Sequence, residues 1–225
     1  MHGKGRMVMK EPGIQVADVD RVIRYRERGI IGQAPQVKTS VLVPLLQDED
    51  GQLSVLFTKR SLSLRRQPGE ISFPGGHREA SDVDDAATAL RETSEELGLD
   101  PADISYIGAL DVLVAWSGLL VYPHVGVLTR PAAIHPNPAE VAEVFTVPLH
   151  TLLNTQPAVY DVSLQPQPPQ DFPYHLVVGG KGYQWRTTKV RQYFYTFGEH
   201  VVWGLTARIL THFLDVLRAA HLGEA

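Results

Sequence analysis

The chain has 225 residues, enough for one domain with a sizeable core, and we expect a single domain over residues 1–225. A hydrophobic fraction of 44% is ordinary for a globular protein, and a formal net charge of −4 argues against a nucleic-acid partner. Without cysteine there is no disulfide, thiol nucleophile or cysteine-ligated metal. No run approaches about 18 apolar residues and the start lacks an apolar signal core, so we expect no membrane partner and, by default, a cytoplasmic location.

The first elements are a short helix and a hairpin. Residues 16–28 have the spacing of a short amphipathic helix. Residues 37–46 and 53–58 are rich in β-formers and flank the polar turn 47–51, which predicts two antiparallel strands. A further short strand over residues 71–73 leads into a glycine-rich turn.

Positive charges follow the hairpin. Arg60, Arg65 and Arg66 stand close to the glycine-rich turn at Gly75 and Gly76. Guanidinium groups bind phosphate through two hydrogen bonds and stay charged at any physiological pH. The segment therefore predicts an anionic substrate, with solvated surface arginines as the alternative. Taken together with the family resemblance of the segments given below, Arg60 and Arg65 are the expected phosphate-binding residues and Arg66 a surface residue. Glycine lets a backbone approach a ligand closely, so both glycines are candidate binding residues.

Residues 84–98 predict a helix with defined ends. Asp84 or Asp85 suits the N-cap, because its side chain can accept a hydrogen bond from the first turn. Gly98 falls where the chain leaves a helix in a left-handed conformation. Between these ends, apolar positions at helical spacing form one narrow stripe: Ala86, Ala89, Leu90, Thr93 and Leu97.

Three carboxylates crowd the last turns of this helix. Glu92 and Glu96 lie one turn apart on the same side face, while Glu95 lies nearly opposite the apolar stripe. Like charges at this spacing cost roughly 0.2–0.5 kcal/mol per pair, and acids are also unfavourable at a helix C-terminus. A bound divalent cation would remove both costs, and oxygen ligands suit Mg²⁺ or Mn²⁺ better than Zn²⁺. The alternative is a solvated acidic face on an ordinary amphipathic helix.

The rest of the chain alternates strands with one long helix. The expected strands cover residues 104–116, 119–128, 144–147, 174–178 and 193–197. A short helix is expected at 149–153, and the stretch 156–173, rich in Pro and Gln, is expected to be a loop or insertion. A helix over 201–218 closes the chain, with an inward face of Leu205, Ile209, His212, Phe213, Val216 and Leu217. Strands mixed with two long helices predict an α/β fold, in which a mixed sheet packs between helices.

The acidic helix and its loop carry a family resemblance. Gly76, followed after a loop by the run from Arg91 to Leu99, resembles the Nudix box, the loop–helix–loop signature of Nudix hydrolases, here over residues 75–99. The loop is one residue longer than in the general box. Glu79 and Asp82 are therefore both candidates for the first glutamate of the box.

The preceding segment, residues 56–76, narrows the resemblance. Ser61, Arg65, Gly69 and Phe73 are each separated by three residues, as in the motif found upstream of the box in Nudix coenzyme A pyrophosphatases. This resemblance adds Gly69 to the substrate-binding candidates. It also implies a Nudix-type α/β/α sandwich with a mixed central sheet.

The resemblance implies a reaction and roles for the acids. The substrate would be coenzyme A or a similar nucleotide diphosphate, cleaved at its diphosphate bond into 3′,5′-ADP and 4′-phosphopantetheine or its acyl form, with Mg²⁺ or Mn²⁺ as cofactor. Glu92 and Glu96 would bind the metal directly, Glu95 would complete the cluster or orient a water molecule, and Arg91 would orient the carboxylates. The general base stays open among four acids: Glu70, Glu95, Glu140 and Glu143.

Three other functions stay open. The substrate would otherwise be another nucleoside diphosphate derivative such as ADP-ribose or NADH. A Nudix-fold module that binds a nucleotide without cleaving it is a second alternative, against which the intact acids at 92, 95 and 96 argue. A purely structural divalent site is the third. The sequence leaves the oligomeric state open.

Overall fold

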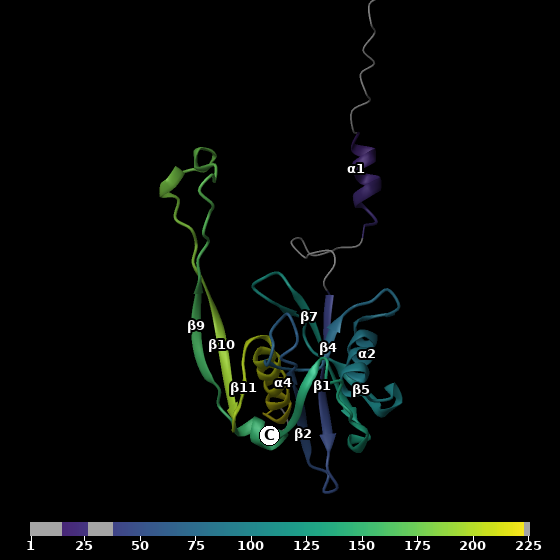
Figure 1. The fold of residues 1–225 in the computed structure, drawn as a ribbon. Helices are drawn as coiled ribbons and strands as arrows, with labels where there is room; N and C mark the ends of the chain where they lie inside the picture. The colour runs from purple at the N-terminus through teal and green to yellow at the C-terminus, as the bar shows by residue number, and fades with distance from the viewer. Residues whose placement is uncertain (1–14, 27–37, 223–225) are drawn as a thin grey trace, which may run out of the picture. The chain divides into compact units, whose positions relative to one another are not determined.

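The computed structural model describes residues 15–26 and 38–222 (Figure 1). The chain divides into two compact units, Met1–Gln33 and Ala34–Ala225. In the first unit, helix α1 (Val16–Ile23) begins where the sequence predicts but ends at Ile23, so the predicted helix is wrong over residues 24–26. Residues 27 and 28 of the predicted helix lie outside the described part. Membership of residues 1–33 in the predicted single domain stays a prediction.

A mixed sheet forms the centre of the second unit. Its strands run in the order β3–β2–β1–β7–β5, with β4 paired to β1, β6 to β7 and β8 to β2. The pair β1–β7 is parallel and the other pairs of this sheet are antiparallel. The strands are β1 (Lys38–Gln47), β2 (Leu53–Arg60), β3 (Ile71–Ser72), β4 (Gly75–His77), β5 (Ile104–Ala109), β6 (Leu113–Val114), β7 (Leu120–Leu128) and β8 (Val141–Pro148).

Helices cover both faces of this sheet (Figure 1). Side chains alternate across a strand, so Leu42 of β1 packs with Leu97 of helix α2 (Asp85–Leu97), while Val43 packs with Leu210 of helix α4 (Gly204–Leu222). Helix α3 (Leu149–Asn154) follows β8. The prediction of an α/β/α sandwich with a mixed central sheet is therefore confirmed.

A second, smaller sheet lies partly in the predicted insertion. Its strands β9 (Ala158–Leu164), β10 (Thr188–Phe197) and β11 (His200–Val202) are antiparallel, in the order β11–β10–β9. The expected loop over 156–173 is therefore wrong for its first half, because the Pro-rich composition starts only after Leu164. β9 instead alternates apolar and polar residues and pairs with β10 over its whole length.

Short 3₁₀ turns join the larger elements: η1 (Pro101–Asp103), η2 (Pro131–Ala133), η3 (Tyr174–Leu176) and η4 (Gly180–Gly182). The expected strand over 174–178 is wrong, since η3 occupies its start. There the Val177 N–H donates to the Tyr174 carbonyl at 3.1 Å, a local bond that takes the place of a partner strand.

Two further expectations need correction. The expected strand over 104–116 is broken into β5 and β6, with a register shift between Tyr106 and Gly108. The closing helix begins at Gly204 rather than residue 201, because residues 200–202 form β11. Its core face centres on Leu210 and Leu214, which leaves Val216, expected to face inward, 45% exposed. No helix among the described residues is both long and apolar enough to cross a membrane.

Candidate active site

Helix α2 begins and ends where the sequence predicts. The Asp84 carboxylate accepts a hydrogen bond from the Ala87 N–H at 2.7 Å and caps the N-terminus. Gly98 closes the C-terminus with a φ of +63°, and a Cβ there would overlap the carbonyl oxygen of His135. Two backbone bonds then attach the segment after β7 to the helix end, from His135 to the Leu97 carbonyl at 2.8 Å and from Asn137 to the Glu96 carbonyl at 2.9 Å.

The three glutamates of α2 have different surroundings. Glu96 is buried, Glu92 is half-buried, and the side chain of Glu95 is 57% exposed. The difference follows from the helical period, because Leu97 and Thr93 face the sheet and Glu96 lies beside them. Desolvation therefore costs more free energy for Glu96 than for the two more exposed glutamates.

Arg91 binds several of the acids around the helix. Its Nε and Nη2 donate to the two oxygens of Asp82 at 2.9 and 3.0 Å, which is a bidentate pair. Its Nη1 donates to Glu95 Oε2 at 3.1 Å, and Nη2 also donates to Glu92 Oε1 at 3.1 Å and to the His77 carbonyl at 3.1 Å. One guanidinium group thus fixes the loop before α2 and orients two of the predicted catalytic acids.

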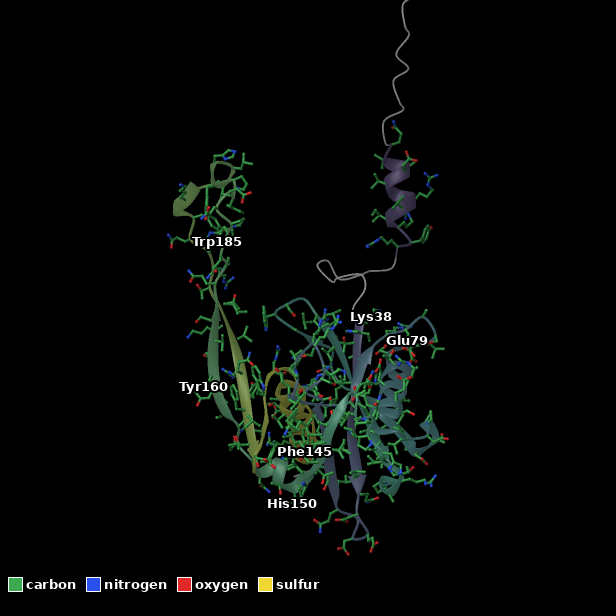
Figure 2. All side chains as sticks on the ribbon, in the orientation of Figure 1. Lys38, Glu79, Phe145, His150, Tyr160 and Trp185 are labelled. Carbon is green, nitrogen blue, oxygen red and sulfur yellow. The ribbon has the colours of Figure 1, made fainter. Side chains whose placement is uncertain are left out.

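Asp82 is the acid that the sequence left undecided. Its carboxylate is buried and accepts hydrogen bonds from the Glu79 N–H at 2.9 Å and the Thr88 hydroxyl at 3.0 Å, besides those from Arg91. The hydrogen bonds from Arg91 hold the pKa of Asp82 well below its usual range. Glu79 is exposed at the outer end of the same loop (Figure 2). Of the two candidate acids, Asp82 therefore belongs to the Arg91 network.

Strand β4 brings the two glycines against the acids. Gly76 pairs with Ser40 of β1, and a Cβ on Gly76 would overlap the carboxyl group of Glu92. The backbone of Gly75 donates a hydrogen bond to Glu96. A Cβ on Gly75 would overlap the Ser40 carbonyl, so both positions need glycine for the strand to lie this close to α2.

The charge of Glu96 is poorly compensated, and that of Glu92 is compensated in part by Arg91. Burial, together with the nearby Glu140 and Glu92, raises the pKa of Glu96 to about 8, while Arg60 acts in the opposite direction. Burial also raises the pKa of Glu92, although Arg91 opposes that shift. A carboxylate with this environment binds a cation or a proton much more readily than a solvated one.

Arg60 lies near these acids and has unused hydrogen-bonding capacity. Its Nε is buried without a hydrogen-bond partner among the described residues, and its Nη2 donates weakly to the Arg66 carbonyl at 3.4 Å. The Gly69 N–H donates to the Arg60 carbonyl at 3.1 Å and so closes the loop between β2 and β3. Arg65 lies exposed on this loop, as does Arg66. The structure thus brings Arg60 to Glu96 and leaves Arg65 in solvent.

The four candidates for the general base differ in the groups that they contact. The Ser61 N–H donates to the Glu140 carbonyl at 2.8 Å, which places Glu140 beside Arg60 and within electrostatic reach of Glu96. Glu143 pairs instead with His200 at 2.9 Å and Lys59 at 3.6 Å. Glu70 accepts a hydrogen bond from Gln67 at 3.0 Å, and Glu95 faces Arg91.

A divalent cation fits part of this acidic group. Within residues 15–26 and 38–222, no three His, Asp or Glu side chains converge in an arrangement ready to hold a metal ion. Glu92 and Glu96 are nevertheless suited to a hard cation, because burial and mutual repulsion raise their pKa values and a cation would reverse both effects. The metal and the roles of the three glutamates stay predictions.

Comparison with known proteins gives a family match and several relatives. The NUDIX domain matches residues 37–164. The peroxisomal coenzyme A diphosphatase NUDT7 of Mus musculus is 46% identical over 138 residues, covering 61% of this chain and 57% of the relative. Nudix hydrolase 22, chloroplastic, of Arabidopsis thaliana is 35% identical over 179 residues, covering 77% of this chain and 53% of the relative.

A bacterial relative matches over more of its length. The uncharacterized Nudix hydrolase NudL of Photorhabdus laumondii is 36% identical over 171 residues, which cover 76% of this chain and 80% of that protein. By contrast, the chain spans little more than half the length of the mouse and Arabidopsis relatives.

Proposed function

Because this chain belongs to the Nudix family, we propose that it is a pyrophosphatase that hydrolyses the diphosphate bond of coenzyme A or of one of its derivatives. The observation that carries the proposal is the meeting of Arg60 with the buried Glu96, one helical turn from Glu92 and beside Gly75 and Gly76. The similarity to a coenzyme A diphosphatase of mouse supports this substrate. The products would be 3′,5′-ADP and 4′-phosphopantetheine or its acyl form.

Each residue of the site has a separate role in this reaction. Glu92 and Glu96 would hold Mg²⁺ or Mn²⁺, which when bound supplies a Lewis acid for phosphate oxygens and lowers the pKa of water. Arg91 positions Glu92 and Glu95 through the hydrogen bonds described above. Arg60 binds the diphosphate through its guanidinium group, whose charge already acts on Glu96, and helps to align the attacking and leaving oxygens.

Glu140 is our choice of general base. Among the four candidates it lies beside both Arg60 and Glu96, and its carboxylate is exposed to entering water. It would take the proton of the attacking water as the new oxygen–phosphorus bond forms and the bridging bond to the leaving phosphate breaks. Glu143 is less suited, since it already forms an ion pair with Lys59 and a hydrogen bond with His200.

A substrate panel tests the proposal. The purified chain is incubated with coenzyme A, ADP-ribose, NADH and a deoxynucleoside triphosphate, each with Mg²⁺ or Mn²⁺, and the products are separated by chromatography. We expect coenzyme A to be cleaved fastest. Brisk cleavage of another compound with none of coenzyme A would overturn the substrate, while no cleavage of any compound would favour a nucleotide-binding module.

The upstream arginines give a sharper version of this test. Arg65 is exposed on the loop that follows Arg60, where its long side chain can reach a bound substrate. We expect Arg65→Ala to raise KM for coenzyme A and to leave ADP-ribose cleavage nearly unchanged. Arg66→Ala, an equal change at the neighbouring exposed position, serves as the control. A cytoplasmic location stays a prediction, to be tested by imaging a tagged chain.

A further inference from the structure

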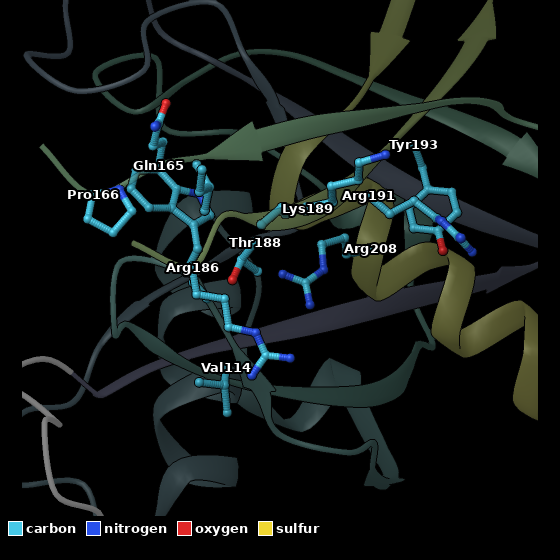
Figure 3. A pocket seen from close by; sticks show the side chains of 13 residues that line it. Val114, Gln165, Pro166, Arg186, Thr188, Lys189, Arg191, Tyr193 and Arg208 are labelled. Atoms are coloured by element: carbon cyan, nitrogen blue, oxygen red, sulfur yellow. The ribbon is translucent and has the colours of Figure 1, made fainter. Parts of the chain in front are cut away.

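A large cavity lies away from the acidic helix. Its volume is about 810 Å³, and its walls come from the end of β6, the strands β9 and β10, and helix α4 (Figure 3). It shares no lining residue with the site formed by Glu92, Glu96 and Arg60. The volume falls in the range of about 300–1,000 Å³ that is usual for pockets holding small molecules.

The walls of this cavity carry four positive side chains and no acid. They are Arg186, Lys189, Arg191 and Arg208. Of these, Arg191 pairs loosely with Asp161 at 3.8 Å. The other three form no ion pair or hydrogen bond with any side chain or backbone group that the structure describes. In a chain of net charge −4, such a concentration of unpaired cations makes a local positive potential that attracts anions.

Acids near the cavity are already engaged. A neighbouring cavity of about 400 Å³ shares Arg208 with the larger one and contains Asp111 and Asp215. Asp111 pairs with His212 at 3.3 Å, and Asp215 pairs with Arg218 at 3.0 Å. Neither acid forms an ion pair with Arg208. Figure 3 shows the guanidinium groups of Arg186 and Arg208 both extending into the larger cavity.

An aromatic side chain stands beside these cations. Trp116, in the turn after β6, lines the cavity and is 68% exposed, so its ring is open to a planar ligand. Tyr193 of β10 lines the same cavity. Phosphate groups bind arginine forks, and nucleobases stack on aromatic rings, so one ligand class satisfies both features.

We propose that this cavity binds a phosphorylated nucleotide, with Arg186 and Arg208 on its phosphate groups and Trp116 against its base. The cavity is separate from the acidic helix, and the proposal rests on the proposed function only where the nucleotide is part of the substrate. The nucleotide has two conceivable sources: the nucleotide end of the substrate itself, or a second molecule that binds independently.

Calorimetric titration of the full chain with 3′,5′-ADP tests the proposal. We expect Arg208→Glu and Arg186→Glu each to weaken binding by about tenfold or more, as when charge-assisted hydrogen bonds to phosphate are lost. Lys181→Glu is the matched control, since it makes the same charge change on an exposed residue of the β9–β10 hairpin outside the cavity. Adenosine, which lacks phosphate, should bind much more weakly than 3′,5′-ADP.

Further variants identify the source of the nucleotide and control for loss of folding. If Arg60→Ala and Arg208→Glu both weaken the binding of 3′,5′-ADP, the cavity holds the nucleotide end of the substrate. If Arg208→Glu weakens it and Arg60→Ala does not, the nucleotide is a second molecule. Arg208→Gln, checked by circular dichroism and thermal melting, covers the case in which charge reversal prevents folding. Equal affinities in Arg208→Glu, Arg208→Gln and Lys181→Glu, or no binding of 3′,5′-ADP to the unmodified chain, would overturn the proposal.

Discussion

Two charged regions of this protein differ in how their charges are balanced. Around α2, Arg91 donates to Asp82, Glu92 and Glu95, so one cation holds several acids in place. Around the cavity, Arg186, Lys189 and Arg208 form no such bonds with described residues. In the first region the charges are paired with each other and stabilise the fold. In the second region the charges are unpaired and available to bind a ligand.

The acidic region contains both kinds of charge. Asp82 is fully hydrogen-bonded and organises the loop, whereas Glu96 is buried with a raised pKa of about 8 and little compensation. Because Asp82 and Arg91 are paired with each other, we assign them to the scaffold. Glu96 has little compensation, as have the cations of the cavity, so we assign it to ligand binding. The predictions below separate these two kinds of residue.

Removing Arg91, the cation paired with Asp82, should have the largest effect on the stability of the fold. Arg91→Ala would leave Asp82, whose side chain is only 4% exposed, as a buried charge without a partner. We expect a loss of about 3–5 kcal/mol in the free energy of unfolding, measured by urea denaturation.

The matched control lies in the other region. Arg191→Ala removes a cation whose partner Asp161 is 3.8 Å away and whose own side chain is 62% exposed. This change should cost less than about 1 kcal/mol. Similar losses in the two variants would mean that the Arg91 network does not stabilise the fold as described.

The paired region could be predicted from the sequence because its signals are local. Asp84 and Gly98 mark the ends of α2 at fixed distances from an apolar stripe, and the helical period places Glu92 and Glu96 one turn apart. Asp82 was harder to assign, because the loop before α2 is one residue longer than the general motif. Its role depends on how that loop folds back onto Arg91.

The cavity and the smaller sheet could not be predicted in this way. β9 is defined by its pairing with β10, which begins more than twenty residues later, and Gln- and Pro-rich sequence directly follows it. Arg186, Arg208 and Trp116 lie on three separate parts of the chain and meet only in the folded protein. Sequence periodicity carries no information about such long-range contacts.

Removing an unpaired acid should impair the reaction more than the fold. Glu96→Gln keeps the shape of the side chain but removes the charge that would hold the cation, so we expect kcat for coenzyme A to fall by at least about 10²-fold. Glu199→Gln, the same change at an exposed position between β10 and β11, should leave kcat unchanged. Undiminished activity in Glu96→Gln would overturn the proposed mechanism.

The pH dependence of the free energy of unfolding should reveal the buried Glu96. The pKa of Glu96 is raised from 4.5 to about 8, so without metal the folded chain retains a proton that the unfolded chain releases. In EDTA, the free energy of unfolding should therefore fall as the pH rises from 4.5 to about 8. Glu92, whose pKa is also raised, acts in the same direction.

Two comparisons isolate this effect. Glu96→Gln should flatten the decline, and so should added Mg²⁺, because it favours the ionised carboxylates. Asp82 acts in a different range: its pKa lies below the usual 3.8, so its stabilisation is present above that pH and is lost in stronger acid. A decline that persists unchanged in Glu96→Gln would assign the effect to another group.

The smallest effect concerns a neutral contact near the cavity. The buried Tyr195 of β10 donates its hydroxyl hydrogen to Thr211 of α4 at 2.9 Å, since the Thr211 hydroxyl itself donates to the Ala207 carbonyl. Tyr195→Phe should cost about 1 kcal/mol in urea denaturation, the usual value of one neutral hydrogen bond. Tyr160→Phe on the same hairpin, where the ring is 62% exposed, should change stability by less than about 0.5 kcal/mol. If Tyr195→Phe cost no more than this control, the contact between β10 and α4 would depend on apolar packing alone.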